Sequence, residues 1–208
     1  MTARKKSPDD EAARKRAVLD AALKHAATDG FNDRVLEEAG KDAGIGAEML
    51  LHLFPRGAAG LVEFFSEQCD TAMERQLAGM KLDGMKVRER IAAAVLARID
   101  ALRPHKESAR RAAAFLMLPM QVGLGTTLVY RTVDAMWRAA GDKATVFNFY
   151  TKRAILAGVY SATLMRWFTD TSADEAETRA FLAARIENVM QFEKFKAQVK
   201  ERFSGARV

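Results

Sequence analysis

The sequence has few of the residues that mark disulfide-rich scaffolds, proline-rich loops and membrane spans. It contains a single cysteine, Cys69, and only four prolines in 208 residues. One cysteine excludes a disulfide within the chain and favours a reducing compartment. The scarcity of proline leaves room for long helices. No run of about eighteen apolar residues occurs, so the sequence predicts no transmembrane helix.

Patterns that carry catalysis are also missing. The three histidines, His25, His52 and His105, are far apart and lack the spacing of metal ligands. No Glu-x-x-His pair indicates a di-iron bundle, and neither a phosphate-binding loop nor a Gly-x-Ser-x-Gly elbow is present. Cys69 has no basic residue close in sequence that would activate it. We therefore expect a protein that is not an enzyme and that needs no metal or cofactor.

The balance of charge is basic. Lys and Arg number 33 against 27 Asp and Glu, which gives a net charge of +6 and a pI of about 9.5. Such a chain is attracted to nucleic acid, to an anionic membrane surface or to an acidic partner, and the charge alone does not choose among them. The basic residues 4–6 are followed by acidic residues 9–11 and not by an apolar signal core. We expect a bacterial cytoplasmic protein, or a mature matrix protein if it is mitochondrial.

Apolar residues recur at helical spacing along most of the chain, and no segment alternates as a strand does. Ser7 followed by Pro8 marks the start of the first helix, and Asp29-Gly30 marks its end. Ser172 and Glu175 match a capping box before the last helix. The predicted fold is all-α, with helices over residues 7–29, 32–43, 47–54, 58–79, 87–102, 106–118, 121–140, 145–168 and 172–203.

The first three predicted helices have the outline of a helix-turn-helix unit. Residues 18–22, Gly30-Phe31, 43–45 and Phe54 resemble the N-terminal domain of TetR-type repressors. This resemblance implies a TetR-like helical bundle with a helix-turn-helix unit at residues 7–57. In such proteins the later helices form a ligand pocket and a dimerisation face, which we place at residues 58–190.

The helix that would read DNA is poorly equipped for the task. Its only polar residues are Glu48, which would repel phosphate, and His52, whereas Arg, Lys, Asn and Gln make most base contacts. Arg14, Lys15 and Arg16 would contact phosphate or simply form a solvated helix face. We expect that the repressor architecture is kept without DNA binding. The alternative is a TetR-type transcriptional regulator that responds to an apolar ligand.

The later helices are rich in Met and Leu, which suit a cavity for a flexible lipid, although such stripes also form ordinary bundle cores. Glycines at positions 123, 125 and 158 stand inside predicted helices, where glycine often marks a close approach of backbone or ligand. The candidate lipid-binding residues are Phe115, Leu118, Met120, Leu124, Leu128, Met136, Leu156, Tyr160 and Leu164.

A more specific resemblance covers residues 15–192. The stretches 116–119, 133–137, 140–154 and 181–190 are similar to the lipid-binding accessory family of ubiquinone (coenzyme Q) biosynthesis. The similarity is densest over residues 116–163. It implies a TetR-like homodimer that holds an isoprenoid lipid, associates with the membrane and presents a quinone precursor to the di-iron demethoxyubiquinone hydroxylase.

The resemblance also implies a surface that contacts this hydroxylase. Two positions depart from the family pattern: Val146 replaces an acidic residue, and Phe149 stands where some members have Trp. Each residue of this block also has a structural interpretation, as a helix cap or as part of the core. The candidate partner-binding residues are Asp134, Trp137, Gly141, Asp142, Asn148, Phe149, Tyr150 and Arg153.

The segment 191–208 reads as a basic amphipathic tail. Its aromatic and aliphatic residues fall on one side of a helical wheel, and its lysines flank them. Rings that sink into the headgroup boundary beside snorkelling lysines are typical of a helix on a membrane surface. Packing on the bundle or across a dimer is the alternative. The candidate membrane-binding residues are Phe192, Phe195, Lys196, Val199, Lys200 and Phe203, and the inner membrane is the expected site.

Three hypotheses about function follow. The first is a lipid-presenting accessory protein, which predicts an isoprenoid in extracts of the purified protein. The second is a DNA-binding regulator, which predicts salt-dependent and sequence-selective binding. The third is an adaptor whose helices form a dimer without a pocket, which predicts a complex with the hydroxylase and no lipid.

Overall fold

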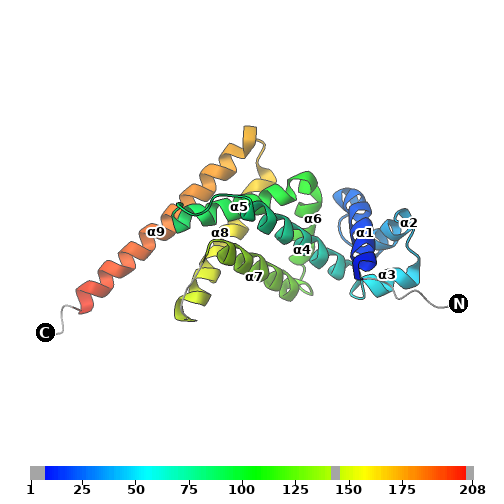
Figure 1. Ribbon diagram of the computed structural model, residues 1–208, viewed down its shortest axis with the longest axis horizontal. Coiled ribbons are helices and arrows are strands. Elements are labelled where there is room, and N and C mark those ends of the chain that lie inside the picture. Colours follow the sequence, from blue (N-terminus) through cyan, green and yellow to red (C-terminus); the bar gives the residue numbers. More distant parts are fainter. Residues whose placement is uncertain (1–7, 142–145, 205–208) are drawn as a thin grey trace. The chain divides into compact units, whose positions relative to one another are not determined.

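The computed structural model describes the backbone of residues 8–141 and 146–204 and the side chains of residues 9–141 and 150–191. Within these ranges the chain is helical and forms no strand, as the sequence predicts (Figure 1). The helices are α1 (Pro8–Asp29), α2 (Asp33–Asp42), α3 (Ala47–Leu53), α4 (Gly57–Ala78), α5 (Val87–Leu102), η1 (Arg103–His105), α6 (Lys106–Leu116), α7 (Val122–Ala139), α8 (Val146–Thr169), η2 (Ala173–Glu175) and α9 (Ala176–Ser204).

The helices group into two compact units. Unit 1 comprises Met1–Met73 and Asp100–Leu128, and unit 2 comprises Glu74–Ile99 and Val129–Val208. These units are defined by packing. The predicted division into segments 7–57, 58–190 and 191–208 is defined by expected function, and it stays a prediction. No helix in the described part of the chain is both long enough and apolar enough to cross a membrane.

Unit 1 contains the helix-turn-helix. Apolar residues at three-four spacing, Val18, Ala22 and Ala26, are fully buried on one side of α1, as the periodicity predicts. α2 packs against α1, and its start is fixed because the Asn32 side chain accepts a hydrogen bond from the amide of Val35 at 3.0 Å. These local signals explain why the first helices begin and end where the sequence predicts.

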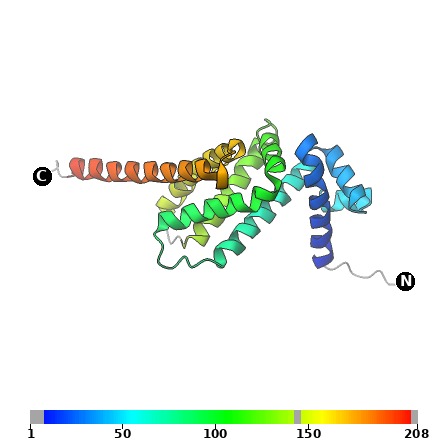
Figure 2. The ribbon, with the colours of Figure 1, turned by 90° about the horizontal axis from the view of Figure 1, so that it is seen from above.

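Unit 2 is built around α5, the second half of α7, α8 and α9. Its fully buried side chains include Trp167, Met136 and Leu182, and α8 packs against α9. The second half of α9, drawn in red, extends beyond the other helices of this unit in both views (Figures 1 and 2).

The connection between α8 and α9 corrects the predicted capping box. The Ser172 side chain makes no cap hydrogen bond to η2, and the Glu175 carboxylate accepts a hydrogen bond from the buried Trp167 indole at 2.7 Å. Ser172 instead caps α9, because its hydroxyl oxygen accepts a hydrogen bond from the amide of Glu177 at 3.1 Å. Asp170 shares the capping role, because its carboxylate accepts hydrogen bonds from the hydroxyl of Ser172 and from the amide and hydroxyl of Thr178. The two hydroxyl donors hold the pKa of Asp170 well below its usual range.

Candidate functional site

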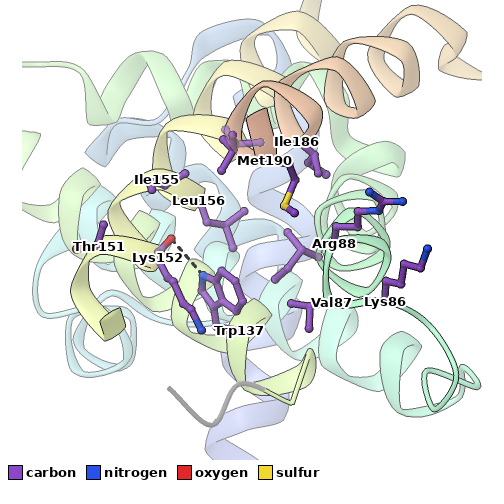
Figure 3. Close-up of a pocket in the computed structure, with 13 residues that line it drawn as sticks. Lys86, Val87, Arg88, Trp137, Thr151, Lys152, Ile155, Leu156, Ile186 and Met190 are labelled. Atoms are coloured by element: carbon purple, nitrogen blue, oxygen red, sulfur yellow. Dashed lines mark hydrogen bonds between the residues drawn. The ribbon is translucent and has the colours of Figure 1, made fainter. Parts of the chain in front are cut away.

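Unit 2 contains an apolar pocket with a volume of about 450 Å³. It lies among α5, the end of α7, α8 and α9 (Figure 3). Leu156 and Ile91 form buried parts of its wall. The volume falls in the range of about 300–1,000 Å³ that is typical of small-molecule sites. The lining residues are Lys86, Val87, Arg88, Ile91, Trp137, Thr151, Lys152, Ile155, Leu156, Val159, Ile186, Val189 and Met190.

The charged residues of the pocket are all basic. Lys86, Arg88 and Lys152 belong to the lining, and none of the lining residues that the structure describes is acidic. Lys86 and Arg88 are exposed, and in Figure 3 their charged ends extend away from Trp137. This arrangement places positive charge at the edge of an apolar cavity, where it would attract an anionic or electron-rich group on an amphiphile.

Trp137 connects α7 to α8 inside this site. Its indole N–H donates a hydrogen bond to the backbone carbonyl of Lys152 at 3.3 Å, drawn as a dashed line in Figure 3. The ammonium group of Lys152 lies 5.2 Å from the centroid of the Trp137 ring, within the range of a cation–π contact. These two contacts hold the ring against α8, so that its apolar surface forms part of the pocket wall.

The pocket has the properties of a binding site. Its walls remove apolar surface of a ligand from water, and its basic rim orients a polar end. Among the described residues, no group of three or more His, Cys, Asp or Glu side chains is arranged to hold a metal ion.

The predicted lipid-binding residues are distributed over both units. Leu156 lines the pocket, whereas Met136 and Tyr160 are buried elsewhere in unit 2 and Leu164 is half-buried. In unit 1, Leu128 is buried, Phe115 and Leu124 are half-buried, and Leu118 and Met120 are exposed. Of these nine residues, Leu156 alone belongs to the pocket lining described above.

Two predicted partner-binding residues form an internal ion pair. The Arg153 guanidinium Nε lies 2.8 Å from Asp134 Oδ1, and the Arg153 side chain is only 4% exposed. Asp134 also pairs with Arg138 at 3.2 Å on the surface of α7. Asp134 and Arg153 therefore help to hold α7 against α8.

The remaining predicted partner residues differ in placement. Tyr150 is 66% exposed near the start of α8, and Trp137 lines the pocket. Gly141 has a φ of +77°, in the left-handed region that favours glycine, and ends α7 in that conformation. Asp142 and the side chains of Asn148 and Phe149 lie outside the described residues.

Residues 191–204 of the predicted membrane-binding tail form the end of α9. The helix continues to Ser204, so the backbone is helical over these positions. The side chains of Phe192, Phe195, Lys196, Val199, Lys200 and Phe203 lie outside the described residues, and their membrane role stays a prediction.

Sequence reasoning missed most of the pocket. α5 contributes Val87 and Ile91, and α9 contributes Ile186 and Val189. These residues carry an apolar signal at helical spacing, but that signal is the same for a core residue and for a pocket residue. The family resemblance extends over residues 181–190, and it is the one sequence signal that α9 belongs to the site.

The face of α3 that corresponds to a recognition helix is not basic. Glu48 and His52 are exposed, and Leu51 is 68% exposed. His52 lies 3.9 Å from the carboxylate of Glu11. A negative charge and a large apolar side chain on this face disfavour contact with DNA phosphates.

Residues 122–193 match the COQ9 family. The chain is 31% identical over 194 residues to the ubiquinone biosynthesis protein COQ9, mitochondrial, of Bos taurus and 32% identical over 190 residues to that of Homo sapiens. Each comparison covers 88% of this chain and 59% of the relative, so the chain spans about three fifths of the relatives' length. The resemblance to this family that the sequence predicts is confirmed.

Solved structures confirm the fold. A TetR transcriptional regulator from Nitrosomonas europaea matches with a TM-score of 0.67 and 19% identity, over 84% of this chain and 97% of that protein. A TetR transcriptional regulator from Rhodococcus sp. RHA1 matches with a TM-score of 0.62 and 15% identity, over 85% and 97%. The chain therefore has the TetR-like all-α fold, with sequence similarity to COQ9 proteins.

Proposed function

We propose, on the premise that this chain is similar to COQ9 proteins over most of its length, that it acts in ubiquinone biosynthesis as a non-catalytic lipid-binding accessory protein. It holds an isoprenoid quinone intermediate at the membrane and presents it to the di-iron hydroxylase. The single observation that carries this proposal is the apolar pocket of unit 2, which lies within and beside the matched residues 122–193.

The chemistry of the pocket suits such a cargo. An isoprenoid chain is apolar and branched, and the pocket wall offers Ile155, Leu156 and Val159 from α8. The ring of a quinone precursor carries oxygen substituents that accept hydrogen bonds, and Lys86, Arg88 and Lys152 are donors beside the pocket. The ring would then sit at the basic rim and the isoprenoid chain inside.

A DNA-binding role is not proposed. The likeness to TetR regulators concerns the fold, which hosts many functions. The exposed Glu48 and Leu51 on α3 are unsuited to a negatively charged groove.

The test is mass spectrometry of organic extracts from protein purified without detergent. We expect an isoprenoid quinone precursor at close to one molecule per chain or per dimer. Ile155→Glu, which places a carboxylate in the apolar wall of the pocket, should reduce this lipid about tenfold or more, because an isoprenoid chain that covers the carboxylate would strip it of water. Met165→Glu is the matched control, since Met165 is an exposed apolar residue of the same helix that does not line the pocket.

Each alternative gives a different result. Bulk phospholipid alone would indicate a general lipid carrier. A protein that carries no lipid but still co-purifies with the hydroxylase would be an adaptor, and the lipid-presenting role would be wrong. Salt-dependent, sequence-selective DNA binding would support the regulator instead.

A further inference from the structure

The turn between α6 and α7 exposes a cluster of large apolar side chains in unit 1. Met120 is 94% exposed, Met117 is 73% exposed, and Leu118 and Val122 are each 52% exposed. Scattered apolar residues on a surface are ordinary, but four strongly exposed ones within six consecutive positions of one turn concentrate apolar surface there. We name residues 117–122 the α6–α7 tip.

Three backbone amides of the tip donate hydrogen bonds within the turn. The amides of Met117, Leu118 and Gln121 donate to the carbonyls of Ala113, Phe115 and Leu118 respectively. Pro119 has no amide proton. The hydroxyls of Thr126 and Thr127 donate to carbonyls one turn earlier in α7. These paired amides lose little when they leave water.

The tip is also held in shape. A Cβ atom on Gly125 would lie 3.2 Å from the carbonyl oxygen of Leu116, so glycine permits a close approach between the first turns of α7 and the end of α6. A short, tightly packed turn presents its apolar side chains without a large loss of conformational entropy on binding.

Charge follows a pattern that fits an anionic bilayer. No residue between Arg111 and Arg131 in the sequence is charged. On α6, the cations Lys106, Arg110 and Arg111 outnumber the single carboxylate of Glu107, with which both arginines pair. Arg111 lies five residues before Leu116, which is about 7.5 Å along the helix axis. This distance matches the depth of about 5–10 Å to which interfacial segments bury their apolar side chains.

We propose that the α6–α7 tip inserts into the headgroup boundary of an anionic membrane, with Arg110 and Arg111 of α6 at headgroup level. The tip is a membrane contact separate from the α9 tail, and it requires neither the quinone cargo nor the hydroxylase. The tip offers Gln121 as its only polar side chain, so it presents few hydrogen-bonding groups to a polar protein surface. An apolar wedge beside an excess of cations is the arrangement that anionic lipid complements.

The first experiment measures binding of the 208-residue chain to phosphatidylcholine vesicles with and without phosphatidylglycerol. The Met117→Glu/Met120→Glu variant should bind the anionic vesicles about tenfold or more weakly, because two exposed methionines are replaced by carboxylates that lipid disfavours. Leu51→Glu is the matched control: Leu51 is another strongly exposed apolar residue of unit 1, on α3. It should leave vesicle affinity unchanged.

A second experiment reports depth. Cys69 is buried and is the chain's only cysteine, so a Cys69→Ala background accepts an environment-sensitive dye at Met120→Cys or at Leu51→Cys. On vesicles the emission of the dye at position 120 should shift to shorter wavelength and be quenched by spin-labelled acyl chains. The dye at position 51 should do neither.

The results separate this inference from the proposed function. If Phe195→Glu/Phe203→Glu abolishes vesicle binding and the tip variant binds normally, the tail is the sole contact and the inference is wrong. If the tip variant binds vesicles normally but sediments as a smaller species, the tip is an interface between copies. An isoprenoid in the extracts would still support the lipid-presenting role in both cases.

Discussion

The Asp134–Arg153 pair offers a direct test of whether these residues hold the fold or contact a partner. Arg153 is 4% exposed, and its Nε lies 2.8 Å from Asp134 Oδ1, whose side chain is 26% exposed. Removing one member of a buried ion pair leaves the other charge uncompensated and costs about 3–5 kcal/mol. Because Asp134 retains some contact with solvent, we expect Asp134→Asn to cost about 3 kcal/mol, near the lower end of that range.

For a chain of this size, 1 kcal/mol corresponds to about 2–4 °C in Tm, so Asp134→Asn should lower Tm by about 6–12 °C in thermal unfolding followed by circular dichroism. Arg138→Ala is the matched control, because Arg138 pairs with the same carboxylate at 3.2 Å but is 65% exposed. Exposed pairs contribute about 0–1 kcal/mol, so its Tm should fall by no more than about 4 °C. The structural role of Asp134 would be refuted if Asp134→Asn kept the Tm of the unmodified protein while it lost binding to the hydroxylase.

Four further changes test the fold. Asp170→Asn should lower Tm at pH 7. Because hydrogen bonds depress the pKa of Asp170 in the folded state, the carboxylate stabilises the fold above its ordinary pKa of 3.8, and that advantage disappears as pH falls through the folded pKa. The Tm difference from the unmodified protein should therefore shrink in acid, and a difference independent of pH would contradict this. Met136→Ala should cost about 2–5 kcal/mol in urea unfolding, since Met136 is fully buried; a small cost with loss of bound lipid would instead place it in a ligand cavity. Gly158→Ala, with no described atom within 4 Å, should stabilise by up to about 1 kcal/mol, whereas Gly125→Ala should not, because its Cβ would crowd the Leu116 carbonyl.

Local signals made the helices predictable. The start of α2 at Asp33 follows from Asn32, whose side chain caps the helix by a hydrogen bond that depends on neighbouring residues alone. The capping box at Ser172 does not form as predicted, because groups outside the motif bond to its members. Asp170 accepts a hydrogen bond from the Ser172 amide, and the buried Trp167 indole donates one to the Glu175 carboxylate. A pattern of four residues contains no information about an indole five residues earlier.

The site was less predictable for the same reason. Helical periodicity identifies the apolar face of α5, but whether Ile91 faces a solid core or a cavity depends on the gap between α5 and α9, which the sequence does not encode locally. Met120 was predicted to line a pocket but is exposed. Its place in an apolar stretch favoured a lipid pocket, yet the turn at Pro119 carries it to 94% exposure. The interior glycines divide likewise, because Gly125 marks a close backbone approach and Gly123 and Gly158 have no described atom within 4 Å.

One residue belongs both to the pocket lining and to the predicted partner-binding set. This gives the proposed presentation of lipid to the hydroxylase a physical basis. Trp137 lines the pocket, and its indole N–H is bonded to the carbonyl of Lys152 on α8. Tyr150 is exposed on the same helix only two residues before Lys152. A partner that engaged Tyr150 would therefore act on the turn of α8 that holds the Trp137 ring in the pocket wall. Coupling between two binding sites is reciprocal. If contact with the hydroxylase lowers the affinity of the pocket for lipid, then lipid in the pocket lowers the affinity of the chain for the hydroxylase by the same factor. Trp137 is placed to carry such coupling, because it lines the pocket and is bonded to the turn of α8 beside Tyr150.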